Sequence, residues 1–282
     1  MGTAFLITLA FCIFEFIGGK ISGSLSLLAD ATHMLTDVSS LGLALFASWM
    51  SGRHATRKMS YGYYRLEILA ALVNGALLLT LAFFITKEAF RRLQTPPSIH
   101  TGLMLVVALI GLAVNLGTGW MLGRFAGRNI NVRGALFHVF ADALSSVGVL
   151  AAGIVLAVTG WRYADSAASF VIATLILASA WWLLKEVVEV LLEAAPSHIN
   201  LEMLEKKILS VPGVEAIHDL HVWTISSGKE SLSAHLEVKC ADTDALLAHV
   251  NQLLSHDFEI HHTTLQVEIM KCKTGQNDGT RF

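Results

Sequence analysis

The chain has 282 residues, of which 54% are hydrophobic and 15% charged, and its formal net charge at pH 7 is -2. Soluble domains carry about 25% charged residues, so this composition predicts a membrane protein. A slightly acidic chain without a basic patch excludes nucleic acid as a partner. Cys12, Cys240 and Cys272 form no C-x-x-C pair, so neither a disulfide framework nor a zinc ribbon is expected.

Six apolar segments are long enough to cross a bilayer, which takes roughly 20 residues as a helix. The first segment has no basic residues before it and no A-x-A-like cleavage site after it, so we expect a spanning helix and not a signal peptide. The expected helices cover residues 3–19, 25–50, 64–90, 101–123, 131–158 and 165–192.

The second and fifth segments share the spacing H-x-x-x-D, as His33 with Asp37 and His138 with Asp142. Ionisable groups in hydrocarbon are costly and are retained mainly where function needs them. Residues four apart lie on one face of a helix, so each segment presents an imidazole and a carboxylate together. Two such faces supply the four ligands of a tetrahedral Zn2+ site. Because four protein ligands leave no open coordination position, we expect metal transport and no enzymatic activity.

Two open questions accompany this site. Each ligand taken singly could instead be a packing histidine or a member of a buried ion pair. Asp30, three residues before His33, is either a hydrogen-bond acceptor or proton path for the site, or a solvated group at the helix mouth.

Glu15 and Asn115 are further polar residues within the apolar segments. A histidine ligand must lose its proton to bind metal, which links metal transport to proton transfer.

The composition changes after Pro196, and eight of the twelve histidines follow from His198 onward. We expect a transmembrane domain over residues 1–195, a soluble domain over 196–272 and a flexible tail over 273–282. The sequence of the soluble part predicts secondary-structure elements in the order α-β-β-α-β. This order is typical of a small α+β domain, which dimerisation would stabilise. The distribution of Lys and Arg over the loops favours a cytoplasmic soluble domain.

Three stretches resemble the cation diffusion facilitator family, in particular its bacterial zinc-efflux branch: residues 24–37 (SLSLLADATHMLTD), 131–138 (NVRGALFH) and 218–223 (HDLHVW). The resemblance implies six transmembrane helices, a metallochaperone-like cytoplasmic domain and a homodimer in the bacterial inner membrane. It also implies export of Zn2+ in exchange for H+ by alternating access, through a site made of His33, Asp37, His138 and Asp142. In this family, a histidine at the position of His33 accompanies preference for zinc over cadmium.

The same resemblance implies that His218, His235, His261 and Glu268 hold a regulatory Zn2+ in the soluble domain. His221 is expected to bridge a second ion, with Cys272 as a candidate partner. Strand alternation would place His218 on the same face as Leu220 and Val222, so a bulge or a site at the sheet end is required. The alternative is that these are surface histidines that bind metal adventitiously.

Three other functions compete with zinc–proton antiport. An intramembrane metalloenzyme is disfavoured because the chain has no H-E-x-x-H motif. A membrane zinc sensor without flux would need no ligands in hydrocarbon. A broader exporter of Zn2+, Cd2+, Co2+ and Ni2+ is the nearest alternative within the transporter class.

Overall fold

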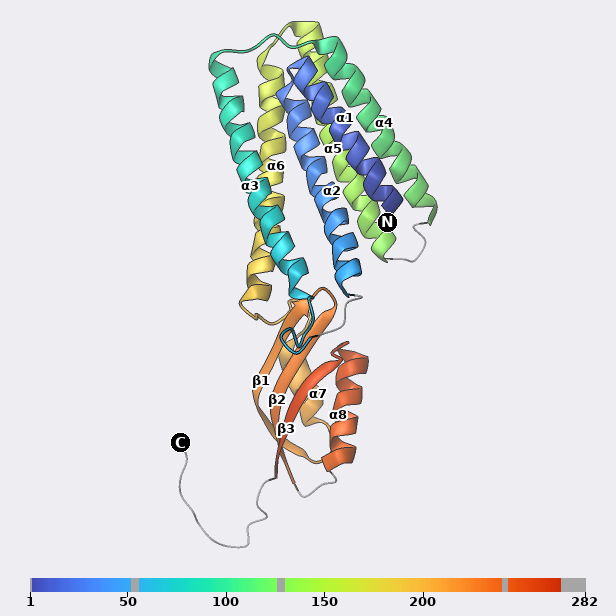
Figure 1. Ribbon diagram of the computed structural model, residues 1–282, viewed down its shortest axis with the longest axis vertical. Helices are drawn as coiled ribbons and strands as arrows, with labels where there is room; N and C mark the ends of the chain where they lie inside the picture. Colours follow the sequence, from blue (N-terminus) through green and yellow to red (C-terminus); the bar gives the residue numbers. More distant parts are fainter. Residues whose placement is uncertain (1, 52–55, 126–129, 240–242, 270–282) are drawn as a thin grey trace. The chain divides into compact units, whose positions relative to one another are not determined.

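The structure is a computed structural model that describes residues 2–51, 56–125, 130–239 and 243–269 (Figure 1). The chain divides into two compact units, Met1–Lys185 and Glu186–Phe282. The domain boundary predicted after residue 195 lies near this division, and the predicted tail at 273–282 lies outside the described residues.

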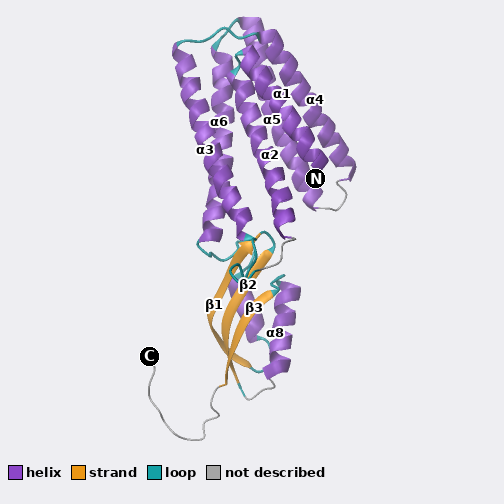
Figure 2. Cartoon of the chain, viewed as in Figure 1, coloured by secondary structure: helices purple, strands orange, loops and turns teal. Residues whose placement is uncertain are grey.

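The first unit is built from long helices, each falling on one of the predicted apolar segments (Figure 2). Helices that follow one another in the chain run in opposite directions (Figure 1). The helices are α1 (Gly2–Ser22), α2 (Leu25–Ser51), α3 (Arg65–Gln94), α4 (Thr101–Phe125), α5 (Ile130–Thr159) and α6 (Tyr163–Leu191).

Five of these helices, α1 and α3 to α6, are long and apolar enough to cross a membrane within the part of the chain that the structure describes. Helix α2 has 27 residues, which is also sufficient length. Its sequence is less uniformly apolar because it contains several polar residues, among them the predicted ligands His33 and Asp37. The helix that departs from the apolar pattern is therefore one that is expected to supply ligands.

The surface of this unit is apolar and its interior is lined by small side chains. Phe83, Trp181 and Trp182 are 62%, 65% and 66% exposed, which would be unfavourable in water and is favourable against lipid. Fully buried alanines such as Ala82 and Ala180 let helices approach closely. The unit therefore has the surface and packing of a helical transmembrane domain.

One buried carboxylate joins the start of α2 to the start of α6. Asp165 accepts hydrogen bonds from the backbone N–H groups of Leu25 (2.8 Å) and Ser26 (3.1 Å) and from the hydroxyls of Ser24 (2.6 Å) and Ser26 (2.7 Å). Arg92 Nη1 lies 3.7 Å from Asp165 Oδ2. The first N–H groups of a helix have no partner within it, and here a distant carboxylate satisfies two of them. This contact fixes the helix that carries His33.

The second unit contains the predicted α-β-β-α-β order. Its elements are α7 (Leu201–Leu209), β1 (Val214–Ser226), β2 (Lys229–Val238), α8 (Thr243–Asp257) and β3 (His262–Ile269). The sheet order is β1-β2-β3, with β1 and β2 antiparallel and β2 and β3 parallel (Figure 2). Gly228, at φ 68°, makes the tight turn between β1 and β2, a backbone conformation that glycine adopts without strain.

The core of this unit lies on one face of the sheet. Alternate β2 residues, Leu232, Ala234 and Leu236, are buried together with Leu204 from α7 and Leu254 from α8. Because strand side chains alternate in direction, the intervening β2 residues point to the opposite face. His235 is one of these, so the predicted ligand lies on the more open side of the sheet.

Candidate metal centres

His33 on α2 and Asp142 on α5 face each other inside the helical unit. Nε2 of His33 lies 3.4 Å from Oδ1 of Asp142, and the two side chains are only 18% and 12% exposed. An imidazole nitrogen and a carboxylate oxygen are ordinary Zn2+ ligands. The packing of α2 against α5 thus brings together one ligand from each predicted H-x-x-x-D pair.

The other two predicted ligands, Asp37 and His138, belong to α2 and α5, but their side chains lie outside the described residues. Helices α2 and α5 run in opposite directions (Figure 1). Asp37 follows His33 by one turn, whereas His138 precedes Asp142 by one turn. The register that sets His33 against Asp142 therefore sets the backbone of Asp37 level with that of His138.

Asp30 belongs to the same polar region of the bundle. It is 3% exposed, so the prediction of a solvated group at the helix mouth is wrong. Its carboxylate accepts hydrogen bonds from the hydroxyls of Ser145 (2.6 Å) and Ser146 (3.3 Å), and Asn115 Nδ2 donates to Ser146 Oγ (3.3 Å). The serines follow Asp142 by about one turn of α5, so Asp30 reaches the helix that carries a predicted metal ligand.

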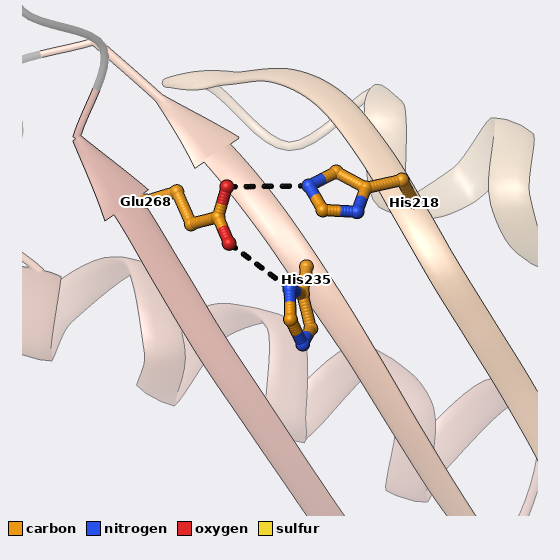
Figure 3. A group of neighbouring side chains, drawn as sticks. All are labelled: His218, His235 and Glu268. Carbon is orange, nitrogen blue, oxygen red and sulfur yellow. Dashed lines mark hydrogen bonds and ion pairs between the residues drawn. The ribbon is translucent and has the colours of Figure 1, made fainter. Parts of the chain in front are cut away.

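In the soluble unit, His218, His235 and Glu268 converge from three strands (Figure 3). His218 Nε2 lies 3.2 Å from Glu268 Oε2, and His235 Nδ1 lies 2.9 Å from Glu268 Oε1. One potential ligand atom from each residue lies within 4.8 Å of the other two. Two imidazoles and a carboxylate at this spacing match the donor set of a Zn2+ site, with room for a fourth ligand.

A β-bulge in β1 gives His218 its orientation. The β1–β2 register pairs His218 with His235, then shifts by one residue before His221 pairs with Ser233. Asp219, the residue after His218, has φ 51° in the left-handed region. The extra residue reverses the alternation, so His218 faces the open side of the sheet while Val222 remains in the core. Of the two arrangements that the sequence left open, the bulge is the observed one.

Hydrogen bonds favour the ionised form of Glu268. The bond from His218 makes the largest contribution to lowering the pKa of this carboxyl, and the bonds from Gln266 and His235 act in the same direction. An ionised carboxylate is the form that binds metal. The three side chains are about one-third to two-fifths exposed, so a metal ion has access from solvent.

The structure does not bring His261 or His221 into this group. His261 immediately precedes β3, seven residues from Glu268, and a strand rises about 3.3 Å per residue, so the two are roughly 20 Å apart. His221 is exposed on the same face as His218 but lies beyond the bulge. Cys272, the candidate partner of His221, lies outside the described residues.

Two contacts of the candidate ligands in the soluble unit, made by Gln266 and Glu237, were not predicted from the sequence. Gln266 Nε2 donates to Glu268 Oε1 at 2.9 Å, and Glu237 Oε1 lies 4.0 Å from His218 Nε2. The spacing in the sequence could have predicted both contacts, because Gln266 precedes Glu268 by two residues and Glu237 follows His235 by two. Residues two apart on a strand share a face.

The helical unit and the soluble unit each match one domain of a known family. Residues 2–192 match the cation efflux transmembrane domain, and residues 196–270 match the cytoplasmic domain of cation efflux proteins. The chain belongs to the cation efflux family, which is the cation diffusion facilitator family that the sequence resembles. It is a multi-pass membrane protein with a cytoplasmic C-terminal domain.

Several relatives match almost the full chain. The metal cation efflux system protein CzcD of Cupriavidus metallidurans is 42% identical, over 96% of this chain and 86% of its own. Zinc transporter ZitB of Pectobacterium atrosepticum is 41% identical, over 95% of this chain and 85% of its own. The cadmium, cobalt and zinc/H(+)-K(+) antiporter of Bacillus subtilis is 38% identical, over 94% of this chain and 87% of its own.

Proposed function

We propose that this protein exports Zn2+ from the cytoplasm across the bacterial inner membrane in exchange for H+, by alternating access. The observation that supports this function most directly is the pair formed by His33 and Asp142, 3.4 Å apart within the helical unit. An intramembrane imidazole beside a carboxylate is costly unless it binds a substrate ion. Asp37 and His138, one turn further along the two helices, complete the proposed four-ligand set.

Competition between metal and proton for the same atoms supports the exchange. Zn2+ requires a neutral imidazole and an ionised carboxylate, so binding the metal releases protons and protonation releases the metal. A site that faces the two sides of the membrane in turn would therefore couple Zn2+ exit to H+ entry. The relative from Bacillus subtilis is named as an antiporter of metal against H(+) and K(+), which agrees with this coupling.

We further propose that His218, His235 and Glu268 bind a regulatory Zn2+ in the cytoplasmic domain and that the protein works as a homodimer. The three-residue group supports the metal site, and the open sheet face on which it lies is available for a second subunit. In such a dimer, His261 or His221 of one protomer could complete a site of the other. Metal bound only by the assembled form stabilises that form by mass action.

A broader divalent exporter is the second candidate. The relatives at 42% and 38% identity are named for metal cations in general or for cadmium, cobalt and zinc, whereas the relative at 41% is named for zinc alone. The mixed nitrogen and oxygen donors of the membrane pair favour zinc over harder ions. We therefore place Zn2+ first.

Proteoliposomes containing a zinc dye and an imposed pH gradient test the proposal. Zn2+ is supplied on the side of the soluble domain, and the wild type is compared with Asp142→Ala. Ser179→Ala serves as a control, because the exposed Ser179 hydroxyl donates to the carbonyl of Leu175 in its own helix and to no other group in the described part of the chain. We expect proton-driven zinc flux in the wild type and the control and none in Asp142→Ala.

Zinc binding without flux in the wild type would contradict the exporter and favour a membrane zinc sensor. Equal fluxes of Cd2+, Co2+ and Zn2+ at equal concentration would instead favour the broader exporter.

A further inference from the structure

Glu15, on α1, is a buried acid that the proposed metal site does not use. Its side chain is 0% exposed, and neither carboxyl oxygen has a hydrogen-bond partner in the described part of the chain. A carboxylate buried without a donor is unfavourable, so the group requires a proton or another cation. The question is which ion it takes.

The carboxyl of Glu15 lies in a space left by a glycine of α4. A Cβ added to Gly111 would stand 2.8 Å from Glu15 Oε1 and 3.6 Å from Ser146 Oγ, so the glycine makes room for the acid beside this serine. Ser146 in turn bonds Asp30 (3.3 Å) and Asn115 (3.3 Å). Polar groups from α1, α2, α4 and α5 thus form one cluster, which we call the Glu15–Asp30 cluster.

Among the residues that the structure describes, the charged groups that act on Glu15 are acidic. They are Asp30 on α2 and Asp142 on α5, while the described side chains of α4 include no titratable group. His33 is the basic group that interacts electrostatically with Asp30 in the described part of the chain, and it belongs to the proposed metal pair. Carboxyl groups brought together in an apolar interior cannot all be ionised at once, so the cluster favours an added positive charge.

A proton fits this cluster better than a metal ion. Among the described residues, only the soluble group His218, His235 and Glu268 gathers three metal-binding side chains within 4.8 Å. Glu15, Asp30 and Asp142 are therefore too spread to enclose one ion. Binding a proton requires only one carboxyl oxygen and a neighbouring acceptor.

The position of the cluster relative to the metal pair suits proton entry. Asp30 precedes His33 by three residues on α2, about 4.5 Å along the helix axis. This displacement is toward the end of the bundle where α2 and α6 begin, and α6 ends at the other end, before the cytoplasmic domain. The cluster therefore lies between the metal pair and the extracytoplasmic side, from which the exchanged proton would come.

We infer that Glu15 and Asp30 form a second proton-binding site, beside the metal ligands, that takes up part of the H+ exchanged for the exported metal. This inference rests on the proposed metal–proton exchange. A proton from the extracytoplasmic side forms an O–H bond with a carboxylate of the cluster. That bond breaks when the proton is released to the cytoplasm, so the protein returns to its starting charge.

The test follows Zn2+ and H+ together in proteoliposomes that contain a zinc dye and a pH dye, with a zinc gradient as the only driving force. Glu15→Gln keeps the size of the side chain but cannot exchange a proton, whereas Glu15→Asp keeps the carboxyl. We expect wild type and Glu15→Asp to move protons against zinc. Glu15→Gln is expected to pass zinc with a lower ratio of protons to zinc, because only the metal ligands then exchange protons.

A matched pair on α4 provides a second test that leaves Glu15 unchanged. Gly111→Ala places a methyl group 2.8 Å from the present position of Glu15 Oε1 and must displace the carboxyl, whereas a Cβ at Gly117 meets no atom within 4 Å. We expect a reduced proton-to-zinc ratio in Gly111→Ala and a wild-type ratio in Gly117→Ala.

The outcomes separate this inference from the function on which it rests. Zinc flux without proton counterflux in the wild type would overturn the antiport itself and the inference with it. A wild-type proton-to-zinc ratio in Glu15→Gln would overturn the inference alone. If Glu15→Gln moves no zinc, the glycine pair decides: a lower ratio in Gly111→Ala alone supports the inference, and equal ratios contradict it.

Discussion

Ionisable side chains inside the helical unit account for much of what this protein can do. Asp30 is held by two serine hydroxyls, and His33 and Asp142 lie 3.4 Å apart. Each would be unfavourable alone in an apolar interior, and in the proposed function each is stabilised by the cation that it binds. In this proposal, metal selectivity and proton coupling depend on a few side-chain atoms.

Replacing His33 by aspartate tests the source of metal preference. Asp142 then faces a second carboxylate, and a shorter side chain with two oxygens replaces a directional nitrogen donor, which favours zinc less strongly. We expect the ratio of Cd2+ to Zn2+ transport to rise in His33→Asp, measured with both ions in separate liposome assays. Unchanged Cd2+ transport would show that His33 does not set the preference.

Replacing Glu268 by glutamine tests the cytoplasmic metal site. Glu268 contacts both histidines of the group, so its loss removes one ligand and the orientation of the other two. Even outer partners of a metal site typically contribute about 10- to 100-fold in affinity, and we expect at least this loss. Calorimetric zinc titration of the full-length protein measures it, with Glu259→Gln as an exposed acidic control outside the site. Equal affinities in the two variants would contradict the assignment.

At the scale of secondary structure, a side-chain contact and a β-bulge position the predicted ligands. Asp165 fixes the first turn of α2, eight residues before His33. The bulge at Asp219 turns His218 toward His235. Neither residue is proposed to bind metal, so both act through the geometry of their elements.

The contact made by Asp165 should contribute strongly to folding stability. Asparagine at this position would lose the negative charge near Arg92 and would direct an amide toward hydroxyl and N–H donors. Loss of one partner of a buried charged pair costs about 3–5 kcal/mol, and we expect a loss of this order in Asp165→Asn. Thermal unfolding in detergent measures it against Asp244→Asn, whose side chain is exposed. Similar midpoints for the two variants would contradict the role of Asp165.

The bulge can be tested by changing only its backbone preference. Asp219 has φ 51°, which costs a β-branched residue about 1–2 kcal/mol and glycine almost nothing. If this strain shifts His218, Asp219→Ile weakens zinc binding at the cytoplasmic site by roughly 10-fold. Asp219→Gly should retain wild-type affinity in the same titration. A comparable loss in both variants would point to the aspartate side chain instead.

At the scale of the whole molecule, two units with different surfaces belong to one chain. The helical unit exposes Phe83, Trp181 and Trp182, as a protein in lipid does. The soluble unit buries its apolar residues on one sheet face and leaves the metal group on the other. A second copy of the chain could cover that open face.

The proposed homodimer should respond to zinc. If metal bound at the cytoplasmic site favours the assembled form, removing zinc with a chelator lowers the dimer fraction. Light scattering during size-exclusion chromatography in detergent measures this fraction with and without zinc. We expect zinc dependence in the wild type and little in Glu268→Gln. If the dimer fraction of the wild type is the same with and without zinc, dimerisation does not depend on metal binding.

The sequence by itself determined the secondary-structure elements, and it indicated which residues are candidate metal ligands in the membrane. Apolar runs of sufficient length specify helices because the backbone must satisfy its hydrogen bonds internally in lipid. The H-x-x-x-D spacing places His33 with Asp37 and His138 with Asp142 because a helix repeats every 3.6 residues. The α-β-β-α-β order of the soluble domain likewise followed from local alternation.

Tertiary structure alone decided which of these residues meet. The pairing of His33 with Asp142 depends on the register of two antiparallel helices, and the serines that bond Asp30 are 115 and 116 residues away in the chain. The bulge that turns His218 toward Glu268 exists because β1 has one residue more than β2 in that stretch. Local periodicity fixes the face on which a side chain lies, whereas contacts between distant segments depend on how their faces pack.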